Sequence, residues 1–344
     1  MENRSREKQD VSQSALPSSN SKSWRIFKIL FSIGLAIGAC IAFYQVFKQT
    51  FPNSQISQFI VRKWISFNGG NDVASVPSGE SVDVPAVRIA IAPIISPEKS
   101  MEMYQPFVSY VGEKLGRKSI GLYRPTYMET NDLVRYQRCD FAIVCTYPFI
   151  RGEREFGMRA LAVPLVKGEE TYQSFIVVPK DSQATTLQDL AGKRFATADI
   201  ISTTGWLFPA MTLIGEGKDP NKFFGELVIT GSHDMSLQAV IDGFVDGAGV
   251  HGIVYDLLVS EDPSIAQKVK ILAKSPPFGI PPIVIHPNLD PKLREAILSV
   301  LLKMHEDDQG KLILTKLQID RFVIPEEALF APLRLAVSKL EKWK

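Results

Sequence analysis

Asp199-Ile-Ile-Ser-Thr-Thr-Gly-Trp-Leu-Phe-Pro209 is the stretch of sequence that decides the fold. Residues 193–198 before it alternate polar and apolar side chains like a short strand, and residues 206–214 form an apolar run at helical spacing. A strand that turns into a helix leaves the first backbone N–H groups of that helix unpaired, and the helix dipole adds partial positive charge there. We therefore expect an anion-binding turn here, held open in a cleft.

Three hydroxyl residues and a glycine form the turn itself. Ser202, Thr203 and Thr204 can each donate and accept hydrogen bonds. Gly205 would let a ligand approach the backbone closely. The alternative is that Ser202 or Thr203 only caps the following helix, because such caps are common. The turn alone leaves both interpretations open.

Length and composition set broad limits. The chain has 344 residues and a formal net charge of +2, so it suits one large or two medium domains and shows no nucleic-acid-binding charge pattern. Its three cysteines, Cys40, Cys139 and Cys145, do not make a disulfide framework. Cys139 and Cys145 would lie about 20 Å apart in one strand at about 3.3 Å per residue. We expect both to be small buried apolar residues.

An apolar segment without formal charge, residues 29–47, follows a polar, Ser-rich start. At about 1.5 Å per residue it is just long enough to span a bilayer. Basic residues are more numerous before it than after it: Arg4, Arg6, Lys8, Lys22, Arg25 and Lys28 against Lys48. This asymmetry predicts a cytoplasmic tail over residues 1–24, a single transmembrane anchor over residues 25–47, and a soluble domain outside the bacterial cytoplasmic membrane.

A lipoprotein signal is the alternative for the same segment. Ile37-Gly38-Ala39-Cys40 resembles a bacterial lipobox, in which the chain is cut before Cys40 and that cysteine is acylated. The apolar run continues to Phe47, which a lipoprotein does not need, so we favour the uncut anchor. A buried core helix is disfavoured by the positive charge on one flank.

The rest of the chain separates into a linker and a folded domain. Residues 48–86 have no sustained pattern and end in a stretch rich in Gly, Ser, Asn and Pro, which predicts a flexible linker. From residue 87 to the end, strand patterns alternate with helix patterns. This alternation predicts an α/β fold with mostly parallel sheets, including a buried strand over residues 139–145.

Short motifs follow one another in a fixed order along this domain. They are the L-x-D-L-x-G-K-x segment Leu187–Arg194, Asp199 with Ser202–Gly205, Gly231-Ser232-His233-Asp234, Val245-Asp246, and Lys274-Ser275-Pro276-Pro277. In this order they resemble the periplasmic phosphate/phosphite/phosphonate-binding proteins of ABC transporters, the PhnD-like family with a type II periplasmic-binding fold. The resemblance covers residues 87 to about 340. Each motif is weak by itself, and their order gives the resemblance its specificity.

The resemblance implies two α/β lobes joined by two crossover strands, with the ligand clamped between them. It places the crossovers near residues 175–181 and 272–277. Lobe one is then 87–178 plus 275–344, and lobe two is 179–274. Ligand contacts from both lobes exist together only in the closed state, so binding would close the hinge.

The resemblance also implies a set of ligand-binding residues. Ser202, Thr203 and Thr204 would donate hydroxyl and backbone hydrogen bonds to a tetrahedral oxyanion, and bonds to a charged acceptor are about twice as strong as neutral ones. His233 would donate from a ring nitrogen and bind better when protonated. Tyr127, at the position of a family tyrosine before the second helix, would donate its phenol from the other lobe.

Further residues complete this expected site. Tyr147 or Phe149 would supply an aromatic side chain that the family often has after its buried strand. Asp234 either orients the ring of His233 or caps the helix that follows it. Without the resemblance, His233 would be interpreted as a turn histidine bonded to the backbone. No arginine or lysine is assigned to the site, which is consistent with binding by dipoles and neutral donors.

One departure from the family pattern limits the ligand. Members that bind aminophosphonates carry acidic residues on the turn after the V-D strand and just past the K-S-P segment. Here the corresponding residues 250–253 and 279–282 include no carboxylate. An ammonium group would lack a partner, so phosphate, phosphite or a small alkylphosphonate is the expected ligand.

Other classes of site have less support. Gly247–Gly252 spells G-x-G-x-x-G, but no carboxylate ends a second strand at dinucleotide-site spacing, and small residues for close packing explain it better. His251, His286 and His305 lack metal-ligand spacing, and no serine-hydrolase elbow occurs. We therefore predict no catalytic residue, cofactor, metal or nucleic-acid partner.

Three functions remain. The favoured one is a membrane-tethered binding protein that delivers a small oxyanion to an ABC permease. The same domain would also suit a sensor that passes a bound-state signal to a membrane partner such as a sensor kinase. An enzyme on this fold is the third, because fold does not fix function, although no nucleophile–base pair is visible.

Overall fold

The computed structural model describes residues 85–343. The predicted tail, anchor and lipobox, and all but the last residues of the predicted linker, lie outside the described residues. Within residues 85–343, no helix has the length and apolar character that a membrane crossing requires. The chain divides into Met1–Ser81 and Val82–Lys344, and every element below belongs to the second unit.

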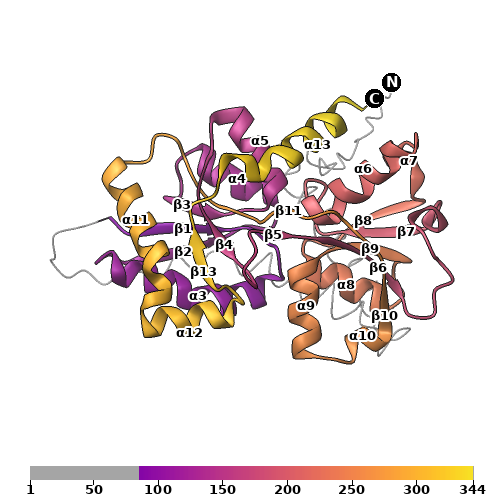
Figure 1. Cartoon of the computed structure of the whole chain (residues 1–344), viewed down its shortest axis with the longest axis horizontal. Helices are drawn as coiled ribbons and strands as arrows, with labels where there is room; N and C mark the ends of the chain where they lie inside the picture. Colours follow the sequence, from indigo (N-terminus) through magenta and orange to yellow (C-terminus); the bar gives the residue numbers. More distant parts are fainter. Residues whose placement is uncertain (1–84, 344) are drawn as a thin grey trace, which may run out of the picture. The chain divides into compact units, whose positions relative to one another are not determined.

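Two main β-sheets organise this unit, one on each side of Figure 1. The first has six strands in the order β13-β4-β12-β3-β1-β2. They are β1 (Val87–Ile91), β2 (Ser119–Tyr123), β3 (Phe141–Ile143), β4 (Arg159–Leu165), β12 (Ile283–Ile285) and β13 (Arg321–Val323). We call this sheet and its helices lobe one.

The second sheet has five strands in the order β10-β6-β9-β7-β8. They are β6 (Ser174–Pro179), β7 (Arg194–Thr197), β8 (Glu226–Ile229), β9 (Gly247–His251) and β10 (Val269–Lys274). This sheet and its helices form lobe two. The protein therefore has the expected α/β architecture of two lobes.

The expectation of mostly parallel sheets is wrong, because each sheet is mixed. β1 is parallel to β2 and β3, and β7 is parallel to β8 and β9. The strands beside the crossings, β6, β10 and β12, are antiparallel to their neighbours. A strand that arrives directly from the other lobe enters its sheet without a helical crossover, so it does not have to run parallel to its neighbour.

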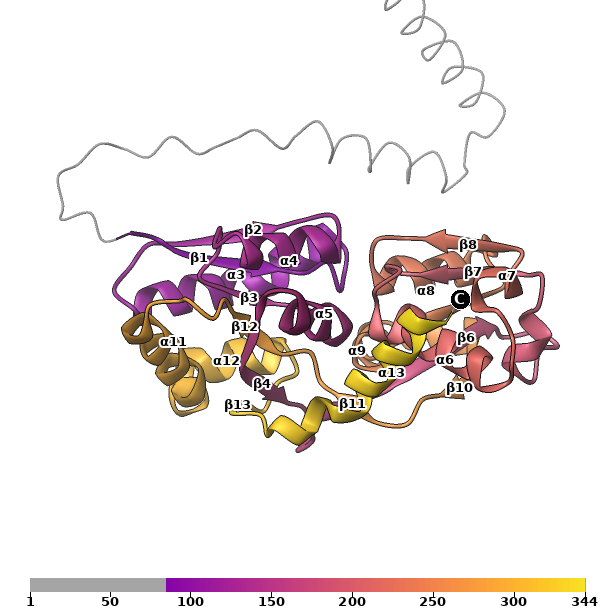
Figure 2. The same ribbon diagram turned by 90° about the horizontal axis from the view of Figure 1, so that it is seen from above.

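The chain passes between the lobes through two short segments that pair with each other. β5 (Thr171–Tyr172) and β11 (Phe278–Gly279) form a two-stranded antiparallel ribbon, which lies between the two groups of strands in Figure 2. The first crossing therefore lies earlier than the predicted residues 175–181, since β6 belongs wholly to the second sheet. The return begins after β10, next to the predicted boundary at residue 274.

Helices cover both sheets. Lobe one has α3 (Pro97–Lys114), α4 (Tyr127–Arg135), α5 (Thr146–Phe156), α11 (Pro291–Lys303) and α12 (Asp308–Lys316). Lobe two has α6 (Phe208–Gly215), α7 (Pro220–Phe223), α8 (His233–Ile241), α9 (Gly252–Glu261) and α10 (Ile265–Lys268). The predicted strand 139–145 is shorter than expected, because α5 begins directly after Cys145.

The C-terminal helix α13 (Ala331–Lys342) packs on both lobes, and Figure 2 shows it extending from β11 toward α6. It contacts α5 of lobe one and α6 of lobe two. Glu341 pairs with Arg154 of α5, and Leu340 packs against apolar residues of lobe two. The helix thus joins the two lobes beside β11 of the crossing ribbon.

The core explains the strand patterns and the glycine motif. Ile89 and Ala90 of β1 lie in two different apolar clusters, so this strand is buried on both faces, as parallel strands require. Cys139 and Cys145 are buried and unbridged, as expected. A Cβ atom on Gly249 would lie 2.4 Å from the carbonyl oxygen of Gly205. Close packing therefore accounts for the G-x-G-x-x-G sequence, as predicted.

Candidate anion-binding site

Several helices of both lobes begin around the turn after β7. Helix N-termini carry partial positive charge from unpaired N–H groups and the helix dipole. The residues at these starts are Tyr127 of α4, Cys145 before α5, Ser202 before the π-helical turn η2 (Thr203–Leu207), His233 of α8 and His251 before α9. This arrangement favours an anion without needing a cationic side chain.

The turn is buried, which corrects the expectation that it is held open in a cleft. Ser202, Thr203, Thr204 and His233 are all 0% exposed, and Tyr127 is 1% exposed. The cause is lobe one, whose loops and helix starts cover the turn and form hydrogen bonds with it. A ligand could enter only when the two lobes separate, as the resemblance implied for a hinged fold.

The helix that follows Ser202 begins with a widened, π-helical turn, η2. The hydroxyl of Ser202 accepts a hydrogen bond from the N–H of Gly205 at 3.0 Å, and its carbonyl accepts from both Trp206 and Leu207. The N–H groups of Thr203 and Thr204 precede the first helical bond and donate to no backbone carbonyl in residues 85–343, and the N–H of Thr203 lies close to the Cys145 sulfur. Single π-helical turns occur often at functional sites. This one leaves two adjacent amide N–H groups without a carbonyl acceptor in the described part of the chain.

His233 is fixed between two hydroxyls. Its Nε2 lies 3.3 Å from Ser202 Oγ and 3.3 Å from Thr204 Oγ1. Its Nδ1 accepts the backbone N–H of His251 at 3.3 Å, which places the ring proton on Nε2. Ser202 then accepts from both Gly205 and His233, so its own O–H is directed elsewhere. His233 therefore orients the hydroxyls of Ser202 and Thr204.

Burial keeps this imidazole neutral. It lowers the pKa of His233 to about 4, although the nearby charge of Asp234 and the carbonyl of Gly249 act in the opposite direction. The ring is uncharged at neutral pH, so the structure does not support the expected protonated donor. A neutral ring still donates from Nε2.

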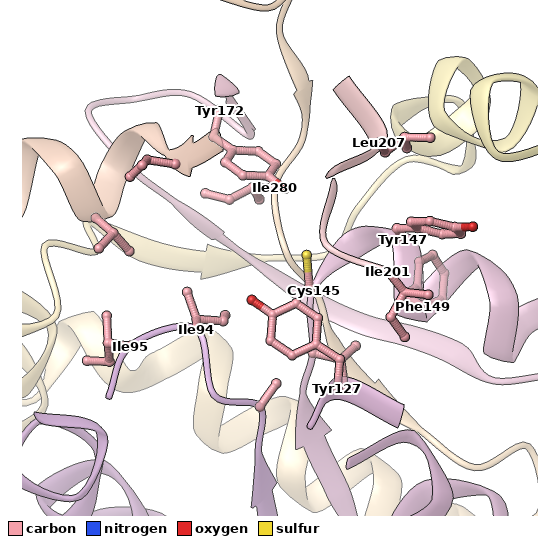
Figure 3. Close-up of a cluster of buried hydrophobic side chains, with 14 of the residues drawn as sticks. Ile94, Ile95, Tyr127, Cys145, Tyr147, Phe149, Tyr172, Ile201, Leu207 and Ile280 are labelled. Carbon is pink, nitrogen blue, oxygen red and sulfur yellow. The ribbon is translucent and has the colours of Figure 1, made fainter. Parts of the chain in front are cut away.

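Two tyrosine hydroxyls are buried beside the turn without hydrogen-bond partners of acceptable geometry among the described residues: Tyr127 and Tyr172. Burial raises the pKa of both well above the usual value, and the nearby hydroxyls of Ser202 and Thr203 respectively oppose the shift. Both phenols therefore remain protonated donors. Figure 3 shows the two rings on opposite sides of the Cys145 sulfur.

Tyr172, His251 and Cys145 also lie at this cluster, although their sequence patterns did not single them out. The ring of Tyr172 lies 4.4 Å from the ring of His251, and the buried Nδ1 of His251 has no partner among the residues described. Cys145 Sγ lies 3.3 Å from Thr203 Oγ1. Each residue occurs in an apolar strand pattern that indicates core, so only its spatial neighbours identify it.

Tyr147 and Phe149 have other positions than expected. The backbone N–H of Tyr147, not its ring, reaches the turn and donates to Thr203 Oγ1 at 2.8 Å. Figure 3 shows the Tyr147 ring directed away from the Tyr127 hydroxyl. The ring of Phe149 packs against Phe330 at 4.9 Å, within the apolar core. Neither ring lies among the donors around the turn.

Acidic residues beside the turn are engaged with the other lobe. Asp199 Oδ2 accepts the N–H of Tyr127 at 3.2 Å, and Asp234 Oδ1 accepts the N–H of Ser96 at 2.9 Å. Asp234 also accepts the Ser232 hydroxyl at 2.6 Å. Asp234 was expected to orient His233 or to cap its own helix. Its carboxylate instead bonds the N–H of Ser96 in the other lobe.

In the part of the chain that the structure describes, no three His, Cys, Asp or Glu side chains are placed to hold a metal ion. None of the predicted site residues, nor Tyr172, His251 or Cys145, is a lysine or arginine. The chemistry of this cluster is therefore hydrogen-bond donation by amides, hydroxyls and neutral imidazoles, which suits a small anion with several acceptor oxygens.

Residues 89–330 match the model of a protein family described as ABC transporter, phosphonate, periplasmic substrate-binding protein. The chain belongs to this family. The phosphonates-binding periplasmic protein of Escherichia coli (strain K12) is 26% identical over 249 residues, which are 70% of this chain and 73% of that relative. The family resemblance inferred from the motif order is thus confirmed.

Solved structures share the fold. A binding protein component of an ABC phosphonate transporter from Pseudomonas aeruginosa has a TM-score of 0.70 at 22% identity, over 75% of this chain and 87% of that one. PhnD1 from Prochlorococcus marinus (MIT 9301), solved with methylphosphonate, has a TM-score of 0.67 at 18% identity, over 75% and 98% of the two chains. These likenesses support the two-domain periplasmic-binding-protein architecture.

Proposed function

We propose that this family member captures a small phosphorus oxyanion between its lobes and presents it to the permease of an ABC transporter. The observation that carries the proposal is the pair of buried, unpartnered hydroxyls of Tyr127 and Tyr172 beside the free amides of Thr203 and Thr204. A buried donor without an acceptor costs about 1–3 kcal/mol. A bound oxyanion would supply acceptors to all four donors at once.

Each donor has a distinct origin in this proposal. Thr203 and Thr204 give backbone N–H groups from lobe two, and Ser202 and Thr204 give hydroxyls oriented by His233. Tyr127 gives its phenol from lobe one, and Tyr172 gives its phenol from the ribbon between the lobes. Because the donors come from different parts of the hinge, the ligand would bind all of them only in the closed state.

The ligand range follows from the acceptors near the turn. Asp199 and Asp234 are bonded to N–H groups of lobe one, and residues 250–253 and 279–282 include no carboxylate that could pair with an ammonium group. We therefore propose phosphate, phosphite or a small alkylphosphonate, and not an aminoalkylphosphonate. Methylphosphonate, the ligand of the Prochlorococcus structure, belongs to this range.

We also propose that residues 25–47 tether the protein to the cytoplasmic membrane as a single-pass anchor, with acylation of Cys40 as the alternative. The basic flank and the apolar run support the proposal. A periplasmic substrate-binding domain on such a tether would remain close to a permease in the same membrane.

Ligand binding can be tested by thermal unfolding of the full chain in detergent micelles. The ligands are phosphate, phosphite, methylphosphonate, 2-aminoethylphosphonate, sulfate and nitrate. A ligand at about 100 times its Kd adds about 2.7 kcal/mol, which should raise Tm by roughly 5–10 °C. We expect this rise with at least one of the first three ligands and not with 2-aminoethylphosphonate. A flat response to all three phosphorus oxyanions would refute the proposal.

Titration calorimetry of Tyr127→Phe and Tyr172→Phe tests the site with the ligand found. Each change removes one donor to a charged acceptor, worth about 1.5–3 kcal/mol, so affinity should fall about 10- to 150-fold. Tyr123→Phe is the matched control, because Tyr123 also has a buried, unpartnered hydroxyl but lies on β2. If Tyr123→Phe lowered the ligand affinity as much as the other two changes, Tyr127 and Tyr172 would not be ligand-binding residues.

A further inference from the structure

Three helices of lobe one have their first N–H groups bonded to side chains of lobe two. At α3, Asp234 accepts the N–H of the N-cap residue Ser96 at 2.9 Å. At α4, Asp199 accepts the N–H of Tyr127 at 3.2 Å. At α5, the hydroxyl of Thr203 accepts the N–H of Tyr147 at 2.8 Å. All three bonds cross between the lobes.

Two of these helices have no side-chain cap from their own sequence. The N-cap residues of α3 and α5, Ser96 and Cys145, form no side-chain capping bond. In α4, Thr126 caps the N–H of Glu129 and leaves the N–H of Tyr127 to Asp199. Helix N-termini need such acceptors, and a carboxylate also interacts favourably with the dipole. Lobe two therefore completes the helix starts of lobe one.

The acceptors are held in place by lobe two itself. Asp199 Oδ1 accepts the N–H of Ile201 at 3.0 Å, and Asp234 Oδ1 accepts the Ser232 hydroxyl at 2.6 Å. These bonds stay within one lobe and do not depend on closure. The carboxylates are thus presented in fixed positions, ready for the N–H groups that arrive when the lobes meet.

The capping residues alternate along the chain with the proposed ligand donors. Asp199 begins the turn that contains Thr204, and Asp234 follows His233 directly. One more lobe-to-lobe bond, from the N–H of His233 to the carbonyl of Ile94 at 3.0 Å, lies in the same place. Lobe closure and donor positioning therefore depend on the same two segments of lobe two.

We propose that the side chains of Asp199, Asp234 and Thr203 are positioning residues for ligand capture, which cap α4, α3 and α5 of the opposite lobe and so stabilise the closed state without touching the ligand. The caps form only when the lobes meet, so they shift the open–closed equilibrium of the unliganded protein. Apparent affinity depends on the fraction in the closed, binding-competent state. Losing one cap should therefore weaken every ligand by the same factor.

Expected magnitudes follow from helix-cap energetics. Replacing an acidic helix N-cap by alanine typically costs about 1 kcal/mol. Here that loss should reduce the ratio of closed to open protein about fivefold. Asp199→Ala and Asp234→Ala should each raise the Kd for methylphosphonate and for phosphite, with their ratio unchanged. The rise reaches about fivefold when the unliganded protein is mostly open, and it is smaller when that protein is mostly closed. Asp234→Asn retains an acceptor oxygen and should restore most of the affinity. A residue that contacts the ligand would instead change the ratio.

Native cysteines report closure without any ligand. Cys145 faces Thr203 across the lobe boundary, whereas Cys139 is buried within lobe one. Iodoacetamide labelling of the unliganded full chain in micelles, resolved by peptide mass spectrometry, should show Cys145 labelled faster in Asp199→Ala and Asp234→Ala when the native protein is mostly closed. For each variant, the factor in labelling rate and the factor in Kd should multiply to about five. Labelling of Cys139 should not change, which verifies that the variants are folded.

Asp290→Ala is the matched control, because Asp290 caps α11 within lobe one by accepting the N–H of Leu293 at 2.9 Å. It should change neither the Cys145 labelling rate nor ligand affinity. The proposal is overturned if, in both alanine variants, the Cys145 labelling rate and the ligand Kd both equal the native values. The inference rests on the proposed function only for the affinity measurement. Faster Cys145 labelling in a protein that binds no phosphorus oxyanion would support the capping proposal and refute the proposed ligand class.

Discussion

At the residue scale, the protonation of one buried imidazole sets the direction of the hydrogen bonds at the turn. His233 accepts the N–H of His251 and donates from Nε2 toward Ser202 and Thr204. A second proton, on Nδ1, would oppose the N–H of His251 and place a charge in a fully buried position. The neutral ring is therefore part of the folded state.

The neutral, buried ring of His233 predicts that the protein loses stability in acid. The pKa of His233 is lowered by burial from 6.5 to about 4, so the unfolded chain takes up the proton first as the pH falls. The contribution is fully present above about pH 6.5 and lost between about pH 6.5 and 4, and it amounts to about 3 kcal/mol. His251, whose pKa burial also lowers, adds in the same direction.

Urea unfolding at pH 7.0 and pH 4.5 measures this contribution. The native protein should lose about 2–3 kcal/mol more between the two pH values than His233→Asn does. An identical pH dependence in the two proteins would show that His233 is not held neutral by the fold.

At the element scale, the π-helical turn keeps its shape because strand β9 lies directly against it. A Cβ atom on Gly249 would be 2.4 Å from the carbonyl oxygen of Gly205 and 2.8 Å from that of Thr204. Backbone atoms cannot move aside as a flexible side chain can. Gly249, one of the glycines of the G-x-G-x-x-G sequence, thus lets β9 pack directly against the turn that carries the amides of Thr203 and Thr204.

Gly249→Ala should displace the turn and lower the free energy of unfolding by about 1–3 kcal/mol. Ligand affinity should fall as well, because the amides of Thr203 and Thr204 move with their carbonyls. Gly215→Ala, at the end of α6, is the control, since its Cβ would meet nothing within 4 Å. Unchanged ligand affinity in Gly249→Ala, measured by calorimetry, would contradict this account.

At the scale of the whole molecule, two lobes close on a buried turn, and a tether is proposed to hold them near a permease. The two interpretations of the N-terminus predict different products. An uncut anchor leaves residues 1–24 on the chain, whereas a lipoprotein loses everything before Cys40 and gains acyl groups.

Intact mass spectrometry and membrane fractionation of the native protein and Cys40→Ser distinguish them. We expect the full-length mass without acylation and retention of Cys40→Ser in the membrane fraction. An acylated N-terminal Cys40, or release of Cys40→Ser into the soluble fraction, would establish the lipoprotein instead. Ligand binding should be the same in both proteins, because the tether lies outside the binding domain.

Local patterns in the sequence determined the strand–turn–helix around Asp199, the two-lobed α/β fold, and the family, because each depends on residues that are close in the chain or on their order. The hydroxyl turn was predicted in this way, whereas Tyr127 was predicted from the family resemblance, and both stay predictions as ligand-binding residues. The neutral state of His233, the approach of Tyr172 and His251, and the bonds of Asp199 and Asp234 to the other lobe depend on burial and on contacts between distant segments. Only the tertiary structure decides these, because desolvation and hydrogen-bond partners are properties of the packed molecule and not of the local sequence.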